Sequence, residues 1–149
     1  MAETETIQQM KADMKAAMKA REKDKLQTIR SLLSSLKNAR IDKGDDLDED
    51  EVISVLSTEA KKRREAAEMY ADGGRDELAE KEEAEIKVIE EYLPEQMTDD
   101  EAEALVDEAI ESTGASSKAD MGKVMGYVMP KIKGRYEGSK MKDIVLGKL

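Results

Sequence analysis

The sequence has no cysteine, histidine, tryptophan or phenylalanine, and its 149 residues include two prolines and four tyrosines. Without histidine or cysteine there is no Ser-His-Asp triad, no cysteine nucleophile and no conventional zinc or haem site. Without cysteine there is also no disulfide framework, which suits a reducing compartment. No glycine-rich phosphate loop follows a strand pattern. We therefore expect neither a metal nor a cofactor.

Long hydrophobic runs are also missing. The longest uncharged stretches, residues 52–58 and 124–130, have seven residues each, whereas a membrane-spanning helix needs roughly 20 apolar residues. The acidic N-terminus lacks the basic and apolar regions of a secretory signal. We therefore expect a soluble, cytoplasmic protein with no membrane partner.

The pattern that is present is helical. Charged residues make up 40% of the chain and hydrophobic residues 39%, and the latter recur at three- and four-residue steps. No segment alternates apolar and polar residues as a strand would. We predict an all-α fold of seven helices in two helical subdomains: four helices in residues 1–94 and a three-helix C-terminal part in residues 98–149.

Several helix starts can be located from capping patterns. Asp48 and Thr98 each precede a glutamate by three residues, the spacing of a capping box. We also predict N-caps at Asp24 and Ser117, which come just before apolar-periodic segments. In the first helix the predicted core stripe is Ile7, Met10, Met14 and Met18.

Charge is unevenly distributed along the chain. Residues 1–43 carry ten basic and six acidic side chains, residues 44–113 carry seven and 26, and residues 114–149 carry eight and three. The formal net charge of −10 argues against a nucleic-acid partner for the molecule as a whole. Screening limits electrostatics to about 8–10 Å, so a local basic patch can still bind phosphate. The alternative is that these lysines only solvate helix faces.

Several tempting motifs have simpler explanations. The alternate aspartates of residues 46–50 lack the glycine and the final glutamate of a calcium loop, and they are better explained as helix-start charges. Ser34 with Lys37, and Ser116 with Ser117, have no accompanying base or oxyanion hole. The cluster Lys61–Arg64 spans most of a helix circumference, which favours a structural role.

The most distinctive segment is residues 120–135. Gly122 and Gly126 leave one helix flank bare, which admits either a packed helix or a sugar-phosphate strand. Lys123 and Lys131 lie opposite the apolar stripe, and Pro130 is expected to kink or end the helix. Glycine in a helix costs about 1 kcal/mol relative to alanine, so a compensating contact is expected.

This segment resembles the tail shared by the YqeY family and GatB, a subunit of the tRNA-dependent amidotransferase. The matching motifs are Asp-Met-Gly-Lys-Val-Met-Gly at 120–126, the turn at 134–138 and the ending at 144–149. Other stretches that resemble YqeY proteins lie at residues 14–20, 26–33, 61–65, 74–75 and 91–96. The turn reads Gly-Arg-Tyr-Glu-Gly, where family members commonly have Ala-Asp between the arginine and the glycine.

The resemblance implies an all-helical protein linked to tRNA-dependent amidation. Its family label, carbon–nitrogen ligase activity with glutamine as amido donor, has no catalytic motif behind it here, so we lean against an enzyme. We expect a non-catalytic module that binds tRNA or a tRNA-amidotransferase complex. The nucleic-acid-binding candidates are Gly122, Lys123, Gly126, Lys131, Lys133, Gly134, Arg135 and Lys140.

Two alternatives remain open. One is an acidic protein–protein adaptor, whose residues 44–113 meet a basic protein partner. The other is an amidotransferase-type enzyme that depends on Ser116 or Ser117.

Overall fold

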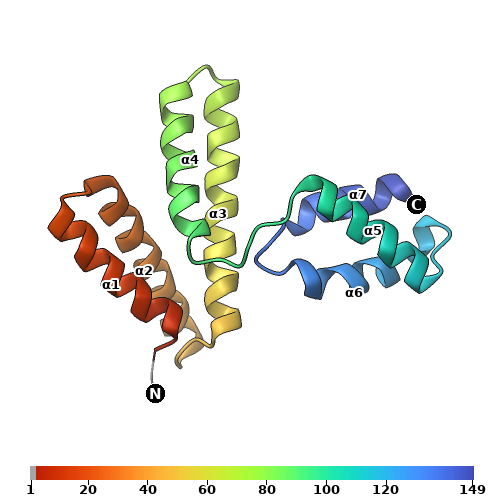
Figure 1. The fold of residues 1–149 in the computed structure, drawn as a ribbon, viewed down its shortest axis with the longest axis horizontal. Helices are drawn as coiled ribbons and strands as arrows, with labels where there is room; N and C mark the ends of the chain where they lie inside the picture. The colour runs from red at the N-terminus through yellow and green to blue at the C-terminus, as the bar shows by residue number, and fades with distance from the viewer. Residues whose placement is uncertain (1–2) are drawn as a thin grey trace. The chain divides into compact units, whose positions relative to one another are not determined.

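The computed structural model describes residues 3–149, and within them every regular element is helical, which confirms the all-α prediction and the seven helices (Figure 1). The α-helices are α1 (Glu5–Ala20), α2 (Lys23–Lys43), α3 (Glu49–Asp72), α4 (Asp76–Glu90), α5 (Asp99–Thr113), α6 (Met121–Ile132) and α7 (Gly138–Lys148). A short 3₁₀ turn, η1 (Lys118–Asp120), precedes α6.

The chain divides into two compact units, one ending at Leu93 and the other spanning Pro94–Leu149. The first unit consists of two helical hairpins, α1 with α2 and α3 with α4 (Figure 1). The second unit packs α5, α6 and α7 together. Each unit has its own apolar core: the first is built around Met10, Ile29, Leu32, Leu56 and Ile89, the second around Val106, Val124, Val128, Met141 and Val145.

The α1–α2 turn is made by Arg21 and differs from the prediction. Arg21 adopts the left-handed conformation with φ 59°, and the Glu22 N–H donates to the Ala17 carbonyl at 2.9 Å. This C-cap lets the chain re-enter a helix at once, so α2 begins at Lys23. The predicted N-cap at Asp24 is therefore wrong, and Asp24 lies in the first helical turn.

The α3 start confirms the predicted capping box. Asp48 Oδ1 accepts from the Glu51 N–H at 2.8 Å, and Glu51 Oε1 accepts from the Asp48 N–H at 3.1 Å. Lys43 also donates to Glu51 at 2.5 Å, so the box ties the end of α2 to the start of α3. Thr98 likewise caps α5, accepting from the Glu101 N–H at 3.1 Å.

The other predicted cap, at Ser117, is wrong. Its side chain makes no capping bond, and the 3₁₀ turn intervenes before α6. Instead, Asp120 Oδ2 accepts from the Ser116 N–H at 3.0 Å, which holds the pKa of that carboxyl below its usual value. The carboxylate therefore fixes the loop that leads into α6.

The predicted core stripe of α1 is also only partly correct. Met10 is fully buried, but Met18 is 50% exposed and Ala17 is buried in its place. Four-residue steps advance by about 400°, so a stripe that uses them repeatedly drifts off the core, whereas a seven-residue step returns to it. Met18 consequently lies beside the helix flank that carries the lysines of α1.

Replacing Asp48 tests how much the α2–α3 junction depends on its cap. We expect Asp48→Ala to lower the free energy of unfolding by about 1 kcal/mol, because the Glu51 N–H loses its acceptor. Asp48→Asn keeps an acceptor and is expected to retain most of the stability. Urea unfolding followed by circular dichroism measures both; equal losses in the two variants would contradict the capping role.

Candidate nucleic-acid interface

Four of the predicted binding residues lie together on α6. Gly122 and Gly126 form one row at four-residue spacing, and Lys123 and Lys131 belong to the adjacent row, with Tyr127 between them. All four are exposed. On the opposite side, Val124, Val128 and Ile132 are buried in the core of the second unit, which fixes the direction of the exposed flank.

The glycine row is open. A Cβ atom added to Gly122 or Gly126 would meet nothing within 4 Å among the described residues outside its own helix turn. Close helix packing within either unit therefore does not explain these glycines. They leave a strip of bare backbone beside the lysine row.

The two lysines of α6 are held loosely. Lys131 Nζ lies 4.5 Å from the centre of the Tyr127 ring, a cation–π contact that keeps the ammonium on this flank. Lys123 Nζ lies 3.8 Å from Asp120 Oδ1, and its side chain is 69% exposed. An exposed pair at this distance contributes little, so either ammonium can turn towards an incoming phosphate.

Pro130 does not end the helix at its own position. α6 continues to Ile132, and the chain then turns at Gly134, which has φ 73°. Proline has no N–H to donate to the Gly126 carbonyl, so this acceptor lacks its usual helical donor at residue 130.

Arg135 and Gly134 belong to the turn after α6, and the structure gives them a supporting role. The Gln96 amide donates to the Gly134 carbonyl at 2.7 Å, Arg135 Nε donates to the Glu95 carbonyl at 2.9 Å, and the Met97 N–H donates to the Arg135 carbonyl at 2.8 Å. These bonds attach the segment before α5 to the turn. Arg135 is thus a structural link as well as a candidate cation.

The remaining candidates, Lys133 and Lys140, are exposed. Lys140 lies in the first turn of α7, where the positive end of the helix dipole disfavours a cation. An anion bound nearby would relieve that repulsion. The described contacts do not link Lys140 to the α6 flank.

Two tyrosine–aspartate pairs were not predicted from the sequence. Tyr136 donates to Asp99 at 2.6 Å and Tyr92 donates to Asp13 at 2.5 Å. Burial and then the hydrogen bond raise the pKa of Tyr136 to about 12, and the same causes raise the pKa of Tyr92 well above its ordinary value. Each pair joins a tyrosine in a turn to an aspartate in a helix far away in sequence, and no short-range motif marks it.

The basic cluster of α3, residues 61–64, has a structural role, and two of its side chains, Arg63 and Arg64, are partly buried. Arg63 is 11% exposed, bonds Glu59 at 2.8 Å and lies 3.9 Å from Glu85 of α4. Arg64 lies 3.9 Å from Glu90. The cluster therefore joins α3 to α4 and presents no common face to a ligand.

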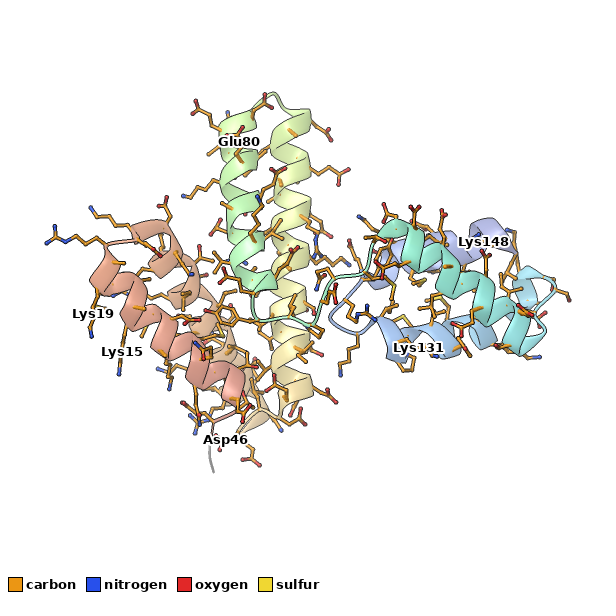
Figure 2. The ribbon with its side chains drawn as sticks, viewed as in Figure 1. Lys15, Lys19, Asp46, Glu80, Lys131 and Lys148 are labelled. Carbon is orange, nitrogen blue, oxygen red and sulfur yellow. The ribbon has the colours of Figure 1, made fainter. Side chains whose placement is uncertain are left out.

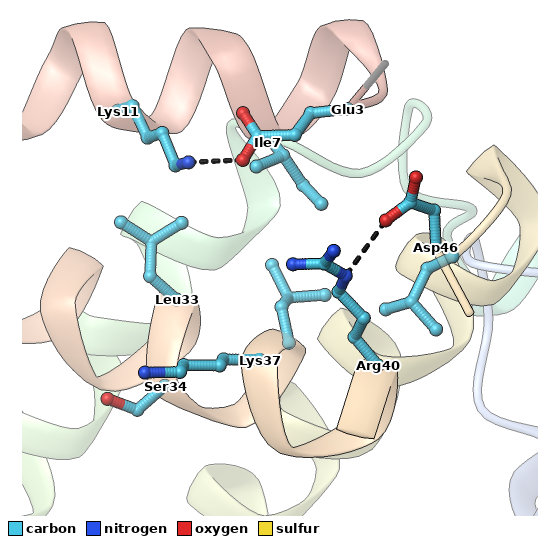
Figure 3. A pocket seen from close by; sticks show the side chains of 10 residues that line it. Glu3, Ile7, Lys11, Leu33, Ser34, Lys37, Arg40 and Asp46 are labelled. Carbon is cyan, nitrogen blue, oxygen red and sulfur yellow. Dashed lines mark hydrogen bonds and ion pairs between the residues drawn. The ribbon is translucent and has the colours of Figure 1, made fainter. Parts of the chain in front are cut away.

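The first unit contains a groove between the start of α1, the second half of α2 and the loop before α3 (Figure 3). It encloses about 500 Å³. Its floor is apolar, and its rim carries Lys11, paired with Glu3, Arg40, paired with Asp46 at 2.8 Å, and Lys37. Among the described residues no group of three or more acidic side chains could hold a metal ion.

The fold and these sites define an all-helical protein whose distinctive exposed feature is a glycine–lysine helix flank. The family model for Yqey-like protein matches residues 7–149, so the chain belongs to the YqeY family. The resemblance to the YqeY family drawn from the motifs is confirmed.

Curated relatives are named "Altered inheritance of mitochondria protein 41, mitochondrial". The one from Pyrenophora tritici-repentis is 30% identical over 96% of this chain and 82% of its own length. The Eremothecium gossypii protein is 37% identical over 60% of this chain, and the Saccharomyces cerevisiae protein 29% identical over 84%. The chain spans about half the length of the Eremothecium and Lachancea relatives, at 50% and 54%.

These relatives correct the expected location. Each carries a mitochondrial name, which contradicts a cytoplasmic assignment. The assignment rested on the lack of a secretory signal, which does not bear on mitochondria. Within residues 3–149, no helix combines the length and apolar character needed to cross a bilayer.

Tyrosine titration tests the Tyr136–Asp99 pair. Because the folded pKa is raised, the pair stabilises the protein below the ordinary tyrosine pKa of about 10, and this contribution is lost as pH rises through about 12. We expect Asp99→Asn to lower the Tyr136 pKa, and Asp100→Asn to leave it unchanged. The difference in ultraviolet absorbance between each protein and its Tyr136→Phe counterpart isolates the ionisation of Tyr136. If the two asparagine variants changed the Tyr136 pKa equally, the pairing with Asp99 would be contradicted.

Proposed function

We propose that the protein is a non-catalytic module that binds tRNA, free or within a tRNA-amidotransferase complex, through the flank of α6 and the turn that follows it. The observation that carries this proposal is the open glycine row beside Lys123 and Lys131. Bare backbone allows a sugar-phosphate strand to approach closely, and the adjacent lysines supply the charge that phosphates need.

The net charge of −10 is compatible with this site. Electrostatic contacts to phosphate act within about 8–10 Å, and in the second unit residues 114–149 carry eight basic and three acidic side chains. Non-specific RNA affinity arises from such local charge and is strongly salt-dependent. Membership of the YqeY family, together with the resemblance to the GatB tail, supports tRNA as the RNA class.

The protein–protein adaptor is the second candidate. Its supporting observation is a groove of about 770 Å³ between α2 and α4, lined by five carboxylates and two lysines. A basic partner segment fits that composition. Binding of a partner protein that survives ribonuclease and is lost on neutralising these carboxylates would favour this function over RNA binding.

A tRNA titration at about 50 and 200 mM salt tests the RNA function. We expect micromolar binding that weakens with salt. Lys123→Gln/Lys131→Gln/Lys140→Gln is expected to weaken it about tenfold and to reduce the slope of log affinity against log salt by two or more, because up to three phosphate contacts are lost. Arg135 is left intact because it supports the turn. Unchanged tRNA affinity in this variant would reject the assigned surface.

The glycines allow a test in which stability and binding change in opposite directions. Alanine at Gly122 and Gly126 meets no neighbour, so the double variant is expected to raise the free energy of unfolding by about 0.5–1 kcal/mol per substitution. It is also expected to weaken tRNA binding by crowding the strand. Gly134→Ala is the control: its positive φ makes alanine destabilising there. A stabilised double variant with undiminished affinity would show that the bare flank is not the contact.

A further inference from the structure

The α1–α2 hairpin carries a second basic surface, distinct from α6. On α1, Lys11, Lys15 and Lys19 recur at four-residue steps. On α2, Lys23, Arg30 and Lys37 recur at seven-residue steps. Seven-residue steps return to nearly the same side of a helix, and the two four-residue steps from Lys11 to Lys19 drift by about 80° in all, so the cations of each helix stay within one half of its circumference.

The groove shows that the two rows share one face. Lys11 of α1 and Lys37 of α2 both line it (Figure 3), which places the two lysine-bearing flanks on the same side of the hairpin. Figure 2 shows Lys15 and Lys19 extending from α1 in a similar direction, as the continuation of the α1 row. We call these six cations, with Ser34 between them on the rim, the hairpin basic face.

Most of this charge is not neutralised internally. Lys15, Lys19, Arg30 and Lys37 are exposed or at the rim and make no ion pair among the described residues. Two acids of the hairpin are directed elsewhere, whereas Glu3 lies at the groove and pairs with Lys11. Asp13 accepts from Tyr92, and Asp24 lines the separate groove against α4.

The groove floor does not offer a large apolar anchor site. Leu36 and Leu47 are already 3% and 8% exposed, so only the partly buried Ile7 and Leu33 offer further apolar area to a docked ligand. The exposed apolar side chains of the hairpin, Met18 and Ile41, are on different helices near opposite ends of it. They form no continuous ridge that a bilayer or an amphipathic helix would bury. Recognition at this face therefore depends on charge.

We propose that the hairpin basic face is a second RNA-binding surface, which contacts the phosphate backbone through its two cation rows. The rows extend about 12 Å along α1 and about 21 Å along α2, long enough to follow several successive phosphates. Ser34 adds a hydroxyl donor on the rim. This inference deepens the proposed function, on which the choice of RNA rests, and adds a contact in the first unit.

The test is a tRNA titration of the full chain carrying Lys15→Gln/Lys19→Gln/Arg30→Gln/Lys37→Gln. The matched control, Lys61→Gln/Arg75→Gln/Lys81→Gln/Lys87→Gln, removes the same charge from exposed positions on α3, on α4 and in the turn between them. We expect the hairpin variant to bind about tenfold or more weakly, with a salt slope reduced by two or more, and the control to remain within about twofold of the parent. Circular dichroism and urea unfolding check that both variants are folded.

The outcomes separate this inference from the proposed function. If the hairpin variant loses tRNA binding while the Lys123/Lys131/Lys140 variant binds normally, the hairpin face is supported and the α6 site is rejected. If only the Lys123/Lys131/Lys140 variant loses binding, the hairpin face alone is rejected. Equal loss in the hairpin variant and its control would overturn the inference, because net charge alone would then explain it. Charge-dependent binding of phosphatidylserine vesicles or poly-glutamate without tRNA binding would also overturn it, in favour of a lipid or an acidic peptide.

Discussion

The structure depends on burying narrow apolar stripes in a chain that is 40% charged and has no tryptophan or phenylalanine. A helix with such a stripe is not stable alone and must pair with a neighbour that covers it. Small and medium side chains then set how closely helices approach: Ala17, Ala60, Ala102 and Ala109 are all buried. The few apolar side chains form two small cores, one in each unit. Most of each helix circumference therefore carries charged residues.

That abundance of surface charge is used in two ways. In α3 and α4, cations meet carboxylates: Arg63 pairs with Glu59 within α3 and lies 3.9 Å from Glu85 of α4, so partly buried pairs help to hold the two helices together. On the α1–α2 hairpin and on α6, cations face outward with weak partners or none among the described residues. The acidic middle of the chain gives the molecule its negative net charge, while both candidate RNA surfaces remain locally positive.

Periodicity and capping chemistry predicted the helical fold, because both depend on residues within one or two turns of each other. The Asp48–Glu51 box is such a case. The sequence failed where a choice depended on the rest of the chain: Arg21 takes a left-handed turn that residue type alone does not favour, and Asp120 holds its loop where a Ser117 cap was expected. The Tyr136–Asp99 contact spans 37 residues, so no local pattern could indicate it. At α6 the glycine row was evident in the sequence, but its freedom from internal packing was not.

The absence of internal packing against the α6 glycines within residues 3–149 changes how these residues are interpreted. In the sequence, Gly122 and Gly126 were consistent with either a helix packed closely within the protein or a surface kept bare for a ligand. The described residues supply no such helix, so the conformational cost of two helical glycines has no internal compensation. We propose that an external contact that needs the backbone exposed compensates this cost. The cation row beside the glycines then favours an anionic strand over an apolar helix as the external partner, because an apolar helix would leave Lys123 and Lys131 facing a surface that cannot solvate them.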